Sequence, residues 1–171
     1  MNGAADSARR EAPGRRRTAA RLAAVQALYQ IELAGTPAET VIGEFVHHRI
    51  GRDHEDVRFG DADPEFFAAL VRGADARRDE LDKLVGDALT PDWPLARLES
   101  VLRAILRAGA YELLGCGDVP AAVVISEYLD IGHAFFAGKE PGLVNGVLDR
   151  LARDLRPEES AGARHGGAAS R

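Results

Sequence analysis

The sequence contains little of what disulfide-linked, membrane-spanning or sheet-rich proteins require. It has one cysteine, Cys116, which excludes an internal disulfide and suits a reducing compartment. Aromatic residues make up 6% of the chain, and this composition favours helices over sheets. No apolar run approaches the roughly 18 residues of a membrane span, and the first residues lack the apolar stretch of a secretory signal. We therefore expect a cytoplasmic protein.

What the sequence does contain is a substantial apolar fraction and an uneven distribution of charge. Apolar residues make up 46% of the 171 residues, enough for a hydrophobic core. The formal net charge is −5, but residues 1–31 carry a net charge of +4 and the rest of the chain −9. An acidic body argues against indiscriminate nucleic-acid binding, whereas a basic segment allows binding at one place.

The strongest helical pattern covers residues 15–34. Its second half repeats apolar residues at helical spacing and should face a core. Its first half carries four arginines: Arg15, Arg16, Arg17 and Arg21. Cations at a helix N-terminus oppose the macrodipole, and Arg17 and Arg21 are like charges four residues apart. We infer that an anion outside the chain uses these arginines.

Helical patterns separated by glycine and proline fill most of the remaining chain. A helix should follow Thr36, and others should cover residues 63–89, 95–114 with a break near Glu99, 121–136 and 143–155. The helix over 121–136 is apolar nearly all round, so it should be central, with Leu129 fully buried. Residues 49–62 have no period, which predicts a surface loop without core residues or a metal. Residues 1–14 and 156–171 are small and polar, which predicts a disordered arm and a disordered tail.

Four collinear motifs resemble the NusB family of bacterial transcription antitermination factors. They read RRRTAARLAAVQALYQIEL from Arg15, VLRAILRAGAYELL from Val101, DVPAAVVISEYLDIG from Asp118 and LVNGVLDRL from Leu143. The resemblance covers residues 15–155. It implies an all-α fold of two small helical subdomains, about seven helices, that share a core. It also implies a protein without catalysis that binds single-stranded boxA RNA together with ribosomal protein NusE. Such a protein would act in the RNA polymerase antitermination complex on ribosomal RNA operons.

The same resemblance implies which residues contact RNA. The four arginines at the start look like the arginine-rich motif of the family, and Tyr29 matches the tyrosine of VQALY at the RNA-contacting surface. Arg103 and Arg107 match basic positions of the middle helix, and Leu143 begins the last helix at a position that faces RNA in relatives. Lys139 lies in the turn before it, where some relatives are acidic, and adds a cation for a phosphate contact. Leu143 stands where relatives can have an aromatic residue, and Leu102 stands where a glutamate occurs. We therefore expect phosphate contacts here more than base-specific ones.

Two alternative functions fit the same helices. The first is the amino-terminal RNA-binding module related to ribosomal RNA cytosine methyltransferases, which works beside a Rossmann-like catalytic half that this sequence does not show. The second is a plain helical protein-interaction module without a role in RNA binding. Titration with boxA RNA and with a scrambled RNA, with and without NusE, would distinguish these functions.

Residue types that carry chemistry elsewhere do not form a catalytic or metal-binding pattern here. His47, His48 and His54 lack the i,i+4 spacing of a zinc-binding helix. Cys116 lies between two glycines without a recognisable histidine partner. The segment 138–142, GKEPG, lacks the spacing of a Walker loop. We therefore expect no catalytic residue, no metal and no cofactor.

Overall fold

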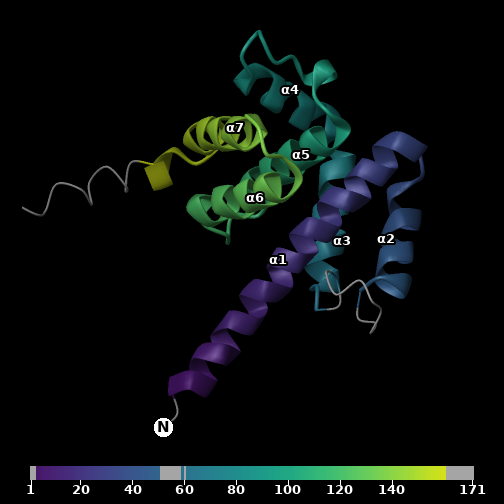
Figure 1. Cartoon of the computed structure of the whole chain (residues 1–171), viewed down its shortest axis with the longest axis vertical. Coiled ribbons are helices and arrows are strands. Elements are labelled where there is room, and N and C mark those ends of the chain that lie inside the picture. Colours follow the sequence, from purple (N-terminus) through teal and green to yellow (C-terminus); the bar gives the residue numbers. More distant parts are fainter. Residues whose placement is uncertain (1–2, 51–58, 60, 161–171) are drawn as a thin grey trace, which may run out of the picture. The chain divides into compact units, whose positions relative to one another are not determined.

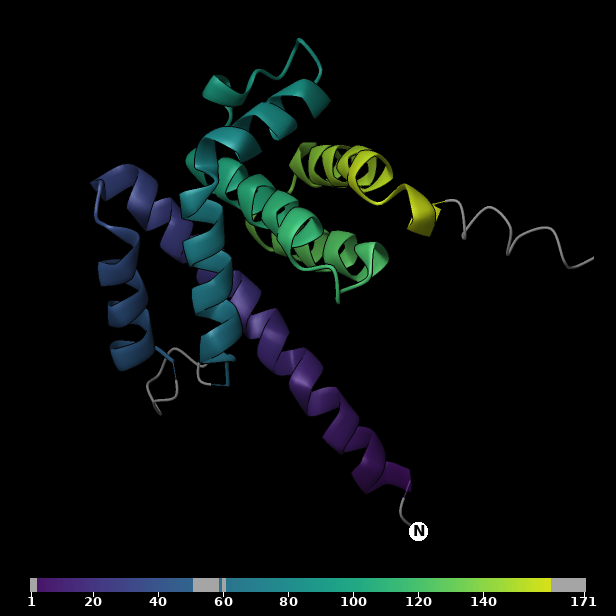
Figure 2. The same cartoon turned by 180° about the vertical axis from the view of Figure 1, so that it is seen from behind.

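A computed structural model of the chain describes residues 3–50, 59 and 61–160, with the side chains of the first helix from Pro13 onward (Figure 1, and from behind in Figure 2). The described part consists of helices and their connections: α1 (Gly3–Ala34), α2 (Ala38–His48), α3 (Pro64–Ala76), α4 (Arg78–Ala88), the short 3-10 helix η1 (Leu95–Arg97), α5 (Ser100–Gly115), α6 (Ala121–Phe135) and α7 (Glu140–Leu155). Over these residues the predicted all-α class with about seven helices is confirmed. The chain divides into two compact units, Met1–Asp75 and Ala76–Arg171.

The core of the first unit contains aromatic rings from α2 and α3. Phe45 and Phe67 are both buried, with ring centroids 5.3 Å apart and planes inclined by 22°. On the surface, Arg72 of α3 donates two hydrogen bonds, of 2.6 and 3.0 Å, to the carboxylate of Glu39 on α2. The hydrogen bond from Arg72 lowers the pKa of Glu39. Both side chains are exposed, so this ion pair adds little stability, and the rings hold α2 and α3 together.

Gly35 forms the turn between α1 and α2. Gly35 has a φ of +66°, a left-handed conformation that glycine adopts without steric cost, and its N–H donates to the carbonyl of Ile31 at 2.9 Å. α2 then begins at Ala38, one residue after its N-cap, Pro37. The carbonyl of Pro37 accepts hydrogen bonds from the next turn. Thr36, the predicted cap, lies outside the helix.

The beginning of α1 differs from the sequence prediction. The helix begins at Gly3, so residues 3–14 are helical where a disordered arm is predicted. Pro13 lies inside the helix, although a proline in a helix interior removes one backbone hydrogen bond and costs about 3 kcal/mol. The segment before it, AADSARREA, is rich in alanine and arginine, which favour helix formation. The prediction rested on the small, polar character of the segment and did not consider this helix propensity.

The segment 49–62 contributes to the core, so the prediction of a loop without core residues is wrong. Ile50, Phe59 and Ala62 are 6%, 5% and 3% exposed. The ring of Phe59 lies 6.2 Å from that of Phe45, centroid to centroid. These apolar residues are irregularly spaced, and an analysis based on periodicity misses them. Residues 51–58 and 60, including His54, lie outside the described residues, so the expectation of no metal there remains a prediction.

The helix predicted over residues 63–89 is two helices, α3 and α4. Its start is as predicted, because Asp63 Oδ1 accepts hydrogen bonds of 3.1 Å from the N–H groups of Glu65 and Phe66. Arg77 interrupts the helix with φ −108° and ψ 22°, next to the boundary between the two units. The buried residues Ala74 and Leu81 are seven positions apart, so the apolar period continues across the break and conceals it.

In the second unit α5 is the most fully buried helix, and the prediction that α6 would be central is wrong. α5 and α7 each pack against the three other α-helices of the unit, and on α5 every residue from Ala104 to Ala110 is buried. On α6 Tyr128 is fully buried but Leu129 is only half-buried, while Val123 and Phe135 are 42% and 39% exposed. A helix that is apolar all round does not reveal which of its faces turns inward. The predicted break at Glu99 is confirmed, because this residue is extended between η1 and α5.

The start of α7 also differs from the prediction. The helix begins at Glu140 rather than Leu143, with Lys139 at the N-cap and Pro141 buried in the first turn. Proline suits this position because the first N–H groups of a helix have no partner within it. The segment 138–142 is therefore partly helical.

Among the described residues, no helix combines the length and the apolar character that crossing a membrane requires.

Three helices meet closely at Gly109. A β-carbon built there would lie 2.9 Å from Leu148 Cδ1 on α7 and 3.3 Å from Tyr128 Cδ2 on α6, and both side chains are buried. We expect Gly109→Ala to lower the free energy of unfolding by about 1–2 kcal/mol, because overpacking outweighs the gain in helix propensity. Gly146→Ala, on an exposed position of α7 with open space around it, should instead raise it by about 0.5–1 kcal/mol. Urea denaturation of both variants tests this, and equal effects would contradict it.

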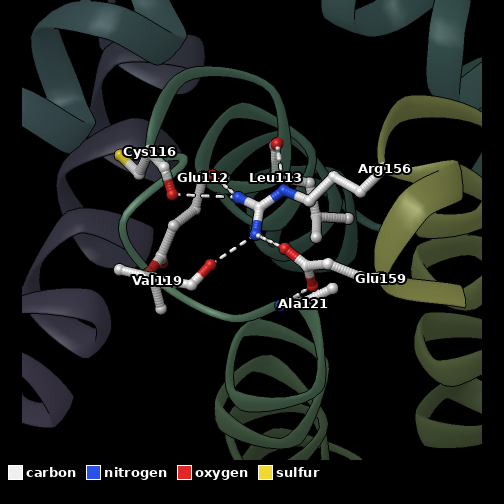
Figure 3. Close-up of polar contacts among 7 residues, drawn as sticks. All are labelled: Glu112, Leu113, Cys116, Val119, Ala121, Arg156 and Glu159. Atoms are coloured by element: carbon white, nitrogen blue, oxygen red, sulfur yellow. Dashed lines mark hydrogen bonds and ion pairs between the residues drawn. The ribbon is translucent and has the colours of Figure 1, made fainter. Parts of the chain in front are cut away.

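Arg156 closes the end of the second unit, inside the segment predicted as a disordered tail (Figure 3). Its guanidinium donates to backbone carbonyls at the end of α5 and in the turn before α6: Leu113 at 2.9 Å, Glu112 at 3.1 Å, Cys116 at 2.9 Å, and Val119. It also pairs with Glu159 at 3.2 Å, and Glu159 accepts a 2.8 Å hydrogen bond from the N–H of Ala121, the first residue of α6. Residues 157–160 are helical, and residues 161–171 lie outside the described part.

Candidate RNA-binding site

The predicted arginine cluster lies on α1 in the first unit, and its members differ in exposure. Arg15 and Arg16 are exposed, and Arg17 is half-buried. Arg21 is only 2% exposed. The first three can meet a ligand from solvent, whereas Arg21 lies inside the surface. The sequence predicts the basic character of this segment but not the burial of its last member.

An aromatic ring from α3 lies against the two inner arginines. The Cζ atoms of Arg17 and Arg21 are 4.5 and 5.1 Å from the centroid of Phe66, within the range of a cation–π interaction. Arg17 and Arg21 are one helical turn apart, so the same ring serves both. The attraction of each cation to the ring offsets part of the repulsion between them.

The start of α3 is attached to the same stretch of α1 through the backbone. The N–H of Asp63 donates to the carbonyl of Arg16 at 3.1 Å, and Asp63 also caps α3 through its carboxylate. Phe66 is in the first turn of this helix. The cap, the ring and the arginines therefore form one connected group in the first unit. Sequence analysis missed Phe66, because nothing local links it to residues more than 40 positions earlier.

Tyr29 lies further along α1. It is 37% exposed, and Leu33, one turn later, is 59% exposed. The two share a helix face, so this part of α1 presents an apolar strip that includes a phenol. A half-exposed tyrosine can stack on a base, which agrees with the expected place of Tyr29 without testing it.

The two arginines predicted on α5 have partners within the second unit. Arg107 forms two hydrogen bonds with Asp82 of α4, at 2.6 and 3.0 Å, and its side chain is 8% exposed. Arg103 donates to the carbonyl of Leu98 and, at 3.0 Å, to the hydroxyl of Ser100. Both guanidinium groups are thus held at least partly by the fold. An RNA contact through Arg107 would require its buried ion pair to open.

Lys139 and Leu143 lie together at the start of α7. Lys139 is exposed at the N-cap, and Leu143 is half-buried one turn later, with its N–H donating to the carbonyl of Lys139 at 3.1 Å. A helix N-terminus and an exposed lysine both favour a phosphate. Leu102, the other departure from the family pattern, is 1% exposed on α5 and is a core residue.

Curated relatives of the chain share its length and about half of its residues. The chain is 52% identical over 149 residues to the transcription antitermination protein NusB of Brucella ovis, a match that covers 87% of this chain and 86% of the relative. It is also 52% identical over 143 residues to the protein of the same name from Brucella anthropi, covering 84% and 85%.

Solved structures show the same fold. The structure of T. maritima NusB matches with a TM-score of 0.68 at 30% identity, covering 86% of this chain and 96% of the other. The structure described as antitermination factors NusB and NusE in complex with dsRNA contains a chain that matches with a TM-score of 0.67 at 26% identity, covering 82% and 98%. The model of the NusB family matches residues 18–153, and the chain belongs to the NusB family.

Proposed function

We propose that this chain is a non-enzymatic transcription antitermination factor that binds boxA RNA together with ribosomal protein NusE. It would work in the cytoplasm, within the RNA polymerase antitermination complex on ribosomal RNA operons. The observation that carries the proposal is the arginine cluster on α1, held against α3 in a chain with the NusB fold. NusB relatives bear the name of antitermination proteins, and one structural neighbour was solved with NusE and RNA.

In this proposal the exposed arginines bind phosphates. The primary contact with the RNA backbone comes from Arg15, Arg16 and Arg17, because a guanidinium offers a planar set of donors that matches phosphate oxygens. Tyr29, Lys139 and Leu143 are secondary positions that approach bases or backbone. Arg103 contributes positive charge, whereas Arg107 remains paired to Asp82, which neutralises its charge within the fold.

Binding measurements with two kinds of RNA test the function. We expect single-stranded boxA RNA to bind more tightly than a scrambled strand, and to bind about 5–150-fold more tightly when NusE is saturating. The coupling must be reciprocal, so RNA should raise the affinity for NusE by the same factor. Binding of NusE with no binding of either strand would favour the plain protein-interaction module. A preference for a duplex over the single strand would redirect the proposal to dsRNA, the ligand named for the neighbour.

The salt dependence of binding tests the arginine contacts. If Arg15, Arg16 and Arg17 each neutralise one phosphate, log affinity should fall against log salt with a slope near −2 for a single strand. We expect the triple alanine variant to lose most of this slope and to unfold at a urea concentration close to that of the wild type, because the high helix propensity of alanine offsets the lost contact of Arg17 with Phe66. Arg78→Ala, a half-buried arginine of α4, is the control and should keep the slope. An unchanged slope in the triple variant would refute the contacts.

A further inference from the structure

We propose that Phe66 is a positioning residue of this RNA-binding site. Its ring holds Arg17 and Arg21 in place, so that Arg17 meets the RNA backbone already oriented and Arg21 supports it from inside. The inference rests on the proposed RNA-binding function. It assigns a role to a residue of α3 that lies outside the arginine-rich segment itself.

The geometry gives Phe66 contact with both cations. The ring centroid is 4.5 Å from Arg17 Cζ and 5.1 Å from Arg21 Cζ. The backbone of Phe66 is held in place, because this residue belongs to the capped first turn of α3. Its N–H donates to Asp63 Oδ1 at 3.1 Å. Asp63 in turn binds the carbonyl of Arg16. Ring and arginines are therefore linked through side chains and backbone at once.

Stacking on a ring is compatible with binding a phosphate. The ring attracts the flat face of a guanidinium, whereas the N–H donors lie in the guanidinium plane and point outward from its edge. Arg17 is half-buried, so a phosphate can approach it from solvent. Arg21 is 2% exposed, which leaves it the role of an inner cation beside the same ring.

The expected benefit is preorganisation. A free arginine side chain samples many rotamers, and ordering it on binding weakens the observed affinity. A ring that already orders Arg17 removes part of that cost. It also offsets the repulsion between Arg17 and Arg21, which would otherwise drive the two side chains apart. Removing the ring should therefore weaken RNA binding without changing how many phosphates are neutralised.

The test compares Phe66→Leu with Phe66→Tyr in the full-length chain. We expect Phe66→Leu to raise the Kd for single-stranded boxA RNA about three- to tenfold with an unchanged salt slope, because the contacts persist but are less ordered. Phe66→Tyr keeps an aromatic ring and should stay within about twofold of the wild type. Phe59→Leu removes a buried ring that packs on Phe45, and it controls for a general loss of packing.

Two further measurements separate positioning from folding. In an Arg17→Ala background, Phe66→Leu should lose most of its effect on Kd, since the ring acts through the arginine. Without RNA, the Nε–H and Cδ–H NMR signals of Arg17 should carry a ring-current shift that Phe66→Leu abolishes and Phe66→Tyr retains. Wild-type affinity in Phe66→Leu, additive effects with Arg17→Ala, or failure of Phe66→Tyr to restore binding would each overturn the inference. A wild-type protein that binds no RNA but shows the ring-current shift would instead overturn the proposed function.

Discussion

Arg156→Ala should lower the free energy of unfolding of the second unit by about 3–5 kcal/mol. The guanidinium is the shared donor for four backbone carbonyls at the end of α5 and in the turn before α6. The carbonyls of Glu112 and Cys116 also accept backbone N–H groups, whereas Leu113 lies in the last turn of α5, where a carbonyl lacks a partner within the helix. Hydrogen bonds from a charged donor are worth roughly 1.5–3 kcal/mol each, and water can replace only part of them in a half-buried place. Urea denaturation followed by circular dichroism measures the loss.

Two matched variants separate the effect of the planar guanidinium geometry of Arg156 from the effect of its positive charge. Arg156→Lys keeps the positive charge but not the planar fork, so we expect it to recover less than half of the lost stability. Arg153→Ala removes an exposed arginine of α7 that pairs with Asp149 at 3.2 Å, and it should cost under about 0.5 kcal/mol. If Arg156→Ala were as mild as Arg153→Ala, the carbonyl contacts would have no structural importance.

The sequence predicts helices well here because the information is local. Apolar residues recur every three to four positions in most elements, and single residues mark some of the boundaries. Gly35 ends α1 in the left-handed conformation, and Asp63 caps α3 through its carboxylate. Glu99 is extended and interrupts the helical structure before α5. Each of these depends only on neighbours within one turn, which a sequence pattern can show.

The incorrect predictions concern contacts between distant parts of the chain. Arg156 binds carbonyls about 40 residues earlier, so its segment reads as a polar tail. The period of α3 continues in phase into α4 and hides the break at Arg77. α6 is apolar nearly all round, so its sequence does not show that Tyr128 faces inward and Leu129 is only half-buried. Phe59 is a single apolar residue in an aperiodic stretch, yet it reaches the core.

In the candidate site, too, the sequence shows the local features but not the contacts between distant residues. The basic segment is visible in the sequence, because four arginines lie within seven residues. The sequence does not show that Arg21 is buried or that Phe66 lies against it, since both depend on how α3 meets α1. The family resemblance assigns Arg103 and Arg107 to RNA but does not reveal their intramolecular partners. Position in a motif and availability to a ligand are separate properties.

Arg107 tests whether a residue at a family RNA-binding position is available to the ligand. We expect its main contribution to be to the stability of the fold. Its side chain is 8% exposed and forms a two-point ion pair with Asp82, itself 27% exposed. Removing one partner leaves the other poorly solvated, so Asp82→Leu and Arg107→Met should each lower the free energy of unfolding by about 2–4 kcal/mol. Methionine retains the apolar stem, which isolates the effect of the charge. The loss is measured by urea denaturation.

The double variant and the salt slope then decide the role of Arg107. Combining Asp82→Leu with Arg107→Met should restore much of the stability, because an apolar pair can replace a buried ion pair. In conditions where Arg107→Met is folded, its salt slope for RNA should equal that of the wild type, since a paired guanidinium neutralises no phosphate. Exposed Lys139 gives the comparison, because Lys139→Met should leave stability unchanged and reduce the slope by about 0.7 if it binds one phosphate. If Arg107→Met reduced the salt slope by that amount and Lys139→Met left the slope unchanged, the ion pair would open on binding and Arg107 would reach the RNA.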